Sequence, residues 1–144
     1  MIEFWNLLKD DAAVKAVNDR IKGLSSLAPN TEALVIATAF RQQPRNLVIV
    51  KNNLYTAQQL FRKLTPLLQE DVLIFNVEES LRVEAIASTP TMYARQMETL
   101  ADIVLNNKPR VIVTHPTALV RYLPSVDTFR RHIIELKNEL ESSL

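Results

Sequence analysis

The chain has 144 residues, of which 47% are hydrophobic and 23% are charged, and its formal net charge is +1. This length predicts one globular domain with a genuine core, and no apolar run approaches the roughly 20 residues that span a bilayer. The near-neutral charge excludes a global field that attracts nucleic acid, but not a local basic patch. The absence of cysteine excludes disulfides, thiolate nucleophiles and cysteine-bound metal sites.

Apolar residues in the N-terminal segment predict one or two short helices over 2–18 that cover an edge of a sheet. Glu3 stands where a signal peptide needs lysine or arginine, and no small-residue cleavage site follows it. We therefore expect a cytoplasmic protein that does not enter a membrane. Residues 20–24 are expected to form a strand parallel to those that follow.

The stretch 23–31 comes next and stands at the nucleotide-binding position of P-loop folds. A phosphate-cradling loop, G-x-x-x-x-G-K-[ST], needs at least two glycines because its backbone must approach the phosphates closely. This chain has a single glycine, no lysine in the loop, and a proline that removes one backbone donor. We therefore expect a degenerate loop that binds no cofactor, formed by Gly23, Ser25, Ser26, Asn30 and Thr31.

Three short apolar runs, mostly β-branched and without polar alternation, read as strands that are buried on both faces. These runs are residues 47–50, 72–75 and 111–113. After Leu123-Pro124 the pattern changes, and residues 132–136 fit either a strand or the start of a helix.

Helical periodicity precedes the first strand and separates the strands from one another. The first helix is opened by Asn30 or Thr31 and closed before Pro44, the second carries an apolar stripe over 57–68, and the third is capped by Thr89. Because strands and helices alternate, we predict an α/β fold with three layers, α/β/α, and a short, mostly parallel sheet.

Ligands of open parallel sheets bind beyond the carboxyl ends of the strands. At such an end, His115 has no accompanying serine and carboxylate, so we interpret it as a structural histidine that caps the next turn. Glu78 and Glu79 read as a solvated loop, and the acidic pair of a phosphorelay receiver is absent. His132 lacks metal-ligand spacing, so we expect no catalytic residue and no metal site.

One basic concentration, Arg121, Arg130, Arg131 and His132, is interleaved with Tyr122 and Phe129. It could contact phosphate or an acidic partner surface, and a solvated face is the alternative.

The order of these segments resembles the opening domain of bacterial transcription-repair coupling factors (Mfd). The resemblance rests on the degenerate Gly-Leu-Ser loop, its helix, the run Leu47-Val48-Ile49-Val50 and the stretch Asn53-Leu54-Tyr55-Thr56-Ala57-Gln58. It continues through Glu84 to Pro90, then Arg95 and Leu100, and closes with Leu119-Val120-Arg121-Tyr122-Leu123-Pro124. It extends over residues 15 to 136.

The resemblance implies a degenerate RecA-like domain, similar to the first domain of the excision-repair protein UvrB, over residues 1–124. Residues 125–144 would then begin a truncated β-rich module, with Thr128 to Leu136 as its first strand.

The family's function is DNA repair by an ATP-driven translocase that displaces stalled RNA polymerase and recruits UvrA. For this chain the resemblance implies a non-catalytic scaffold or adaptor whose partners are the other domains of the same polypeptide. UvrA, RNA polymerase and DNA would be reached through the parent protein, and ATP and magnesium would belong to its motor domains. The alternatives are a nucleotide-binding ATPase or helicase half-domain, and a stand-alone α/β protein-interaction module.

Overall fold

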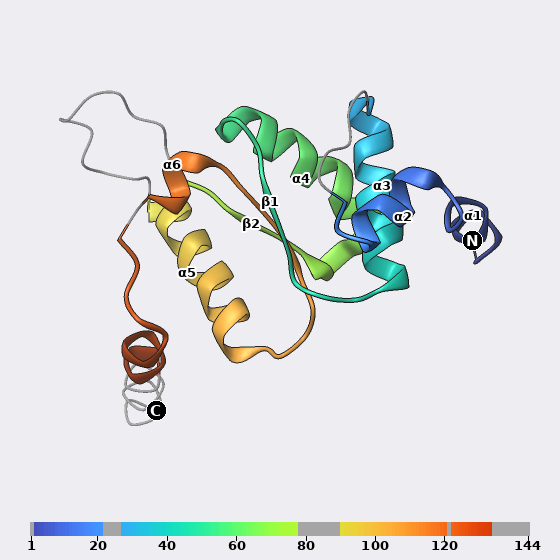
Figure 1. The fold of residues 1–144 in the computed structure, drawn as a ribbon. Helices are drawn as coiled ribbons and strands as arrows, with labels where there is room; N and C mark the ends of the chain where they lie inside the picture. Colours follow the sequence, from blue (N-terminus) through green and yellow to red (C-terminus); the bar gives the residue numbers. More distant parts are fainter. Residues whose placement is uncertain (1, 22–26, 78–89, 121, 134–144) are drawn as a thin grey trace.

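A computed structural model of the chain describes residues 2–21, 27–77, 90–120 and 122–133 (Figure 1). Helices and strands alternate along most of this length, as the sequence predicts. In chain order the elements are α1 (Ile2–Leu8), α2 (Ala12–Asn18), α3 (Pro29–Gln42), β1 (Leu47–Val50), α4 (Leu54–Leu68), the 3-10 turn η1 (Gln69–Asp71), β2 (Val72–Phe75), α5 (Pro90–Leu105), β3 (Val111–Thr114) and α6 (Pro116–Leu119).

The three strands form a parallel sheet in the order β1-β3-β2. The register places Val111 of the central strand opposite Leu47 on one side and Val72 on the other. Each strand is a run of β-branched or other large apolar residues, which suit a pleated and largely buried surface. The predicted α/β class and the parallel sheet are confirmed.

Helices cover both faces of the sheet. Side chains of the central strand point alternately to the two faces, and each face has its own apolar cluster. Val111 and Val113 belong to the main core, which α3 and α4 complete with Ala37, Phe40 and Leu64 among others. Ile112 points the other way and packs in a smaller cluster with Leu100 of α5. Figure 1 shows α5 on one side of the sheet and the α3 and α4 pair on the other.

Strand β1 departs from the prediction of burial on both faces. Leu47 and Ile49 pack against the main core, whereas Val48 and Val50 are 59% and 48% exposed. The cause lies in the sheet order, because α5 packs against β2 at the opposite edge and leaves this side of β1 uncovered by the described residues.

The two N-terminal helices exist, but they do not cover an edge of the sheet as predicted. Val14 of α2 packs with Val35 and Ala39 of α3 in a cluster of their own. From α1, Trp5 packs against the main core, and the Arg41 guanidinium of α3 lies 4.5 Å from its ring centroid. Helix α3 is therefore covered on one side by α1 and α2 and on another by α4.

The predicted strand at 20–24 is wrong for its described part. Arg20 follows α2 with φ 55°, which lies in the left-handed region and outside the range of a β-strand. Ile21 is 59% exposed, so it does not contribute to a buried strand either. Residues 22–24 lie outside the described residues.

Helix starts follow local capping chemistry, with one correction. Helix α4 opens with a capping box, in which the Asn53 side chain accepts from the Thr56 N–H and the Thr56 side chain bonds the Asn53 backbone. Helix α3 begins at Pro29, one residue before the predicted openers, because proline favours the first helical position. Helix α5 begins at Pro90 as predicted, and Thr89 lies outside the described residues.

The strand expected at Thr128 to Leu136 is also wrong where the chain is described, because residues 126–133 are helical. Ser125 explains the helix start, since its hydroxyl accepts from the Thr128 N–H at 3.3 Å and its carbonyl from the Phe129 N–H at 2.9 Å. The sequence ambiguity at 132–133 is therefore resolved in favour of helix.

Candidate functional site

The nucleotide-binding position of a P-loop fold would lie at the start of α3. Gly23, Ser25 and Ser26 of the predicted degenerate loop lie outside the described residues. Asn30 and Thr31 occupy the exposed first turn of α3. The described residues at this position belong to the start of α3 and to the neighbouring end of β1.

An ion pair occupies this helix start. Glu32 lies in the first turn of α3, and Lys51 follows β1 directly, where its backbone N–H donates to the Thr114 carbonyl at 2.9 Å. The Lys51 Nζ lies 2.8 Å from one carboxylate oxygen of Glu32 and 3.0 Å from the other. Both side chains are about one quarter exposed, at 25% and 27%.

The Glu32–Lys51 pair would compete with a phosphate for the start of α3. The N-terminal end of a helix carries partial positive charge, and the Glu32 carboxylate already supplies the anion there. Pro29 offers no backbone N–H, so the first turn also lacks one of its donors. A bound triphosphate would meet the charge of Glu32 and would have to displace it from Lys51.

His115 is fully buried at the junction of β2 and β3. Its Nε2 accepts a hydrogen bond from the Val77 N–H at 3.3 Å, which ties the end of one strand to the end of the other. The ring stands at the N-cap position of α6 but makes no side-chain capping bond to that helix. The bond to Val77 gives His115 a contact within the fold, whereas the predicted capping contact is wrong.

The predicted basic concentration lies apart from the start of α3. Arg121 is outside the described residues, whereas Arg130 and Arg131 are exposed on the helical segment 126–133. Arg130 donates to the Val104 carbonyl in the last turn of α5 at 3.2 Å, and Arg131 donates to the Asp127 carbonyl at 3.4 Å. A cation at a helix C-terminus is stabilising, so Arg130 has a role within the fold.

A buried arginine cluster was not predicted from the sequence. Arg110, 6% exposed, precedes β3 and joins Asp102 of α5 to Asp71 of η1. Its Nε lies 2.7 Å from Asp102 Oδ2, and its Nη1 lies 3.1 Å from Asp71 Oδ1. These residues are 8 and 39 positions away along the chain, a spacing that forms no motif.

The cluster shifts the titration of both partners. Hydrogen bonds from Arg110 hold the pKa of the Asp102 carboxyl below its ordinary value, although burial acts in the opposite direction. The same hydrogen bond raises the pKa of the Arg110 guanidinium. The pair is therefore charged at neutral pH and fixes α5 against the start of the sheet.

A pocket of about 410 Å³ opens beside this cluster, along the outer side of β2. Its apolar wall consists of Phe61 of α4 and the strand residues Val72, Leu73 and Ile74. Its polar wall comes from η1 and α5 with Glu70, Arg95, Glu98 and Thr99, next to the Asp102 and Arg110 pair.

Neither a metal-binding group nor a membrane-spanning helix is found in the described part of the chain. No three His, Asp or Glu side chains among these residues gather closely enough to hold a metal ion. No helix within the same ranges is long and apolar enough to cross a bilayer.

Of the comparisons with known proteins, the one with curated sequences finds relatives. No protein-family model matches the chain, and no solved structure matches it. The transcription-repair-coupling factor of Bacillus subtilis (strain 168) is 22% identical over 121 residues, which are 82% of this chain and 10% of that protein. The protein of the same name from Staphylococcus aureus (strain bovine RF122 / ET3-1) is 24% identical over 115 residues, or 79% of this chain and 10% of its own length.

The chain spans about a tenth of the length of the curated relatives it matches. Over roughly four fifths of its residues, it is similar to one region of bacterial transcription-repair-coupling factors.

Proposed function

We propose that this chain is a non-catalytic scaffold domain of the transcription-repair-coupling type, with a RecA-like layout whose nucleotide site has decayed. The observation that carries the proposal is the Glu32–Lys51 ion pair at the start of α3. In the proposed layout this pair lies where a P-loop fold holds phosphate, and the protein itself supplies both the anion and its counter-ion.

The similarity to coupling factors supports the biological setting of this role. In the proposal, the domain positions other parts of a repair polypeptide and has no reaction of its own. UvrA and RNA polymerase are then partners of the whole polypeptide, which also carries the ATP-driven motor. The fold and the ion pair support the scaffold, whereas the coupling activity rests on the similarity.

Titration of the 144-residue chain with a fluorescent ATP analogue and magnesium tests the decayed site. We expect no saturable signal up to about 1 mM, because binding would have to displace Glu32 from Lys51 at a helix start that lacks one donor. Glu32→Gln removes the resident anion, and Lys63→Gln serves as the control on α4.

Saturation at micromolar concentration would contradict the decayed site, most clearly if Lys51→Gln abolishes the signal and Lys63→Gln does not. That outcome would support a nucleotide-binding half-domain instead.

A chimaera tests the setting of the domain in repair. We expect the B. subtilis coupling factor to retain strand-specific repair of transcribed DNA when this chain replaces its matching region, because a scaffold needs only the same fold and end positions. The measurement is the repair rate of the transcribed strand relative to the non-transcribed strand. A chimaera that folds and hydrolyses ATP but shows no strand bias would contradict the proposal.

A further inference from the structure

Strand β1 is an edge of the sheet, because β3 pairs with it on one side and no described strand pairs with it on the other. The Leu47 and Lys51 N–H groups donate to carbonyl oxygens at or next to the ends of β3, both at 2.9 Å. The N–H and C=O of one strand residue point to the same side, and this side alternates along the strand. Val48 and Val50 therefore turn their N–H and C=O groups away from β3.

These outward groups lie on exposed residues. Val48 is 59% exposed and Val50 is 48% exposed. Among the described residues, no side chain or backbone group forms a hydrogen bond with the main chain of either valine on this side. Their side chains share the sheet face of α5, but that helix packs against β2. Both the edge and one face of β1 are thus open at the same two residues.

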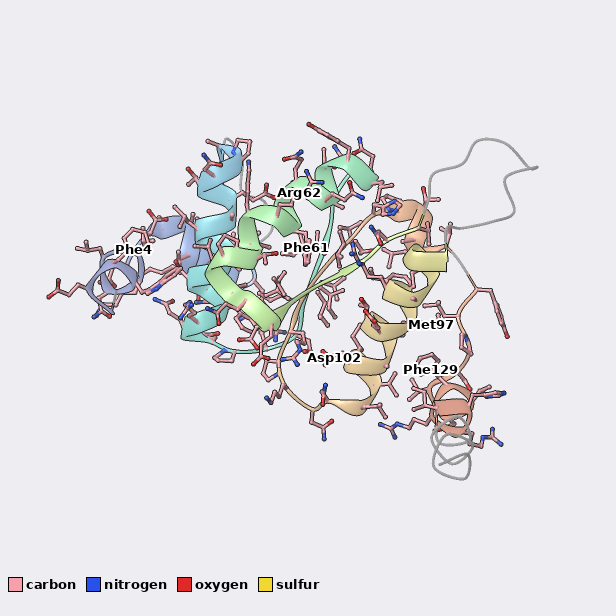
Figure 2. The ribbon with its side chains drawn as sticks, turned by 180° about the vertical axis from the view of Figure 1, so that it is seen from behind. Phe4, Phe61, Arg62, Met97, Asp102 and Phe129 are labelled. Atoms are coloured by element: carbon pink, nitrogen blue, oxygen red, sulfur yellow. The ribbon has the colours of Figure 1, made fainter. Side chains whose placement is uncertain are left out.

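The other edge of the sheet, along β2, is closed. Val72 and Ile74 are each 4% exposed, and the Thr99 hydroxyl of α5 donates to the Ile74 carbonyl at 3.0 Å. Figure 2 shows α4 with Phe61 and α5 with Asp102 on opposite sides of this strand. Of the two edges, β1 is therefore the one at which the sheet can be extended.

Strand β1 lacks the features by which natural edge strands avoid pairing. Such strands are commonly interrupted by proline, by a bulge or by charged residues, lysine above all. The sequence of β1 is Leu-Val-Ile-Val, and its register with β3 is continuous. Lys51 follows the strand directly, but its ammonium group is held by Glu32 of the same chain. The open edge is therefore apolar and regular.

We propose that β1 pairs with β1 of a second copy of the same chain, antiparallel and about a two-fold axis at Ile49. In this register Val48 of each copy lies opposite Val50 of the other, and each such pair exchanges both backbone hydrogen bonds. These bonds use every outward N–H and C=O of Val48 and Val50 in both copies. The two three-stranded sheets then become one continuous sheet.

The sequence of the edge favours a second copy over an unrelated segment. The run Val48-Ile49-Val50 reads the same in both directions, so an antiparallel copy places identical residues opposite one another. Cross-strand pairs of β-branched residues stabilise a sheet, and the paired valines cover each other's exposed side chains. The nearest charge, Lys51, lies opposite Leu47 of the second copy, so no like charges meet. Because the paired edge is short, the association is weak and depends on concentration.

Sedimentation velocity of the full chain over a concentration series tests the proposal. We expect reversible dimers for the wild type. Dissociation should be at least about tenfold stronger for Val48→Lys and for Val50→Glu, because each change places a charge against a valine at two symmetric positions. Both side chains are exposed in the single chain, so circular dichroism and the unfolding midpoint should stay close to wild type.

An equimolar mixture of these two variants tests the register. The mixed pair restores the dimer, because the introduced lysine of one chain lies opposite the introduced glutamate of the other, and the remaining two positions pair valine with valine. Val126→Lys is the matched control, since Val126 is 53% exposed and lies outside the sheet. This change leaves the association as in wild type.

Hydrogen exchange provides a measurement without any variant. Exchange at the Val48 and Val50 amides slows as the wild-type concentration rises, whereas exchange at the Leu47 and Lys51 amides, which already bond towards β3, does not change. A wild-type chain that stays monomeric up to about 1 mM overturns the proposal. So does a dimer that is indifferent to both substitutions, or a mixture of the two variants that stays dissociated. These outcomes are independent of nucleotide binding and of repair.

Discussion

Replacing Leu64 by alanine is expected to lower the free energy of unfolding by about 3 to 4 kcal/mol. Leu64 is 0% exposed and lies in the middle of α4, where the main core joins α3, α4 and the sheet. The loss combines the transfer free energy of the deleted carbons with the cavity that α3 and the strands cannot close. Urea denaturation followed by circular dichroism measures the change.

Leu7→Ala is the matched control, because the same atoms are removed from a side chain that is 80% exposed. We expect its effect to stay within about 0.5 kcal/mol. If the two variants lose similar stability, the core is not centred on α4 as described.

Removal of the Asp102 carboxylate is expected to cost about 2 to 3 kcal/mol at neutral pH. In Asp102→Ala, the Arg110 guanidinium stays buried. Among the described residues it keeps only Asp71 as an ion-pair partner, and the Asp71 side chain is 44% exposed. Breaking one side of a buried pair is more costly than losing a surface pair, because the other charge remains out of water. Chemical denaturation at a series of pH values measures the difference from wild type.

The pH dependence has a definite sign. The pKa of Asp102 in the folded chain lies below the ordinary value of 3.8, so its contribution to stability is complete above that value. It is lost as the pH falls through the lower, folded pKa, and the gap between wild type and Asp102→Ala should narrow there. Asp10→Ala, which removes an ion pair with Lys15 whose side chains are 73% and 58% exposed, should show almost no gap at any pH. A gap that is constant into strong acid would contradict the assigned role of Arg110.

Local pattern located most elements correctly. The strands over 47–50 and 72–75 have their predicted bounds, and the third extends one residue further, to Thr114. The stripe from Ala57 to Leu68 became the buried side of α4. These predictions succeeded because apolar periodicity reflects which side of an element is removed from water.

The errors arose where local sequence leaves two conformations open. Residues 20–21 and 128–133 both contain β-branched or apolar residues, but Arg20 adopts a left-handed conformation and Ser125 caps a helix. Helix α3 begins at Pro29, one residue before the predicted openers. Backbone conformation at such junctions depends on single hydrogen bonds that periodicity does not record.

The candidate sites required the tertiary structure. Sequence reasoning identified the missing glycine and lysine of the nucleotide loop, but it assigned no role to Glu32 or Lys51, which are 19 residues apart. The Arg110 cluster and the pocket beside it join side chains from separate elements.

The sequence by itself determined the α/β class, the alternation of elements and the absence of thiol chemistry, because composition and periodicity act locally along the chain. Only the tertiary structure decided the order β1-β3-β2, and with it the uncovered side of β1. The physical reason is that strand order depends on which crossover helix buries its apolar side against which strand, a choice made by packing between segments distant in sequence.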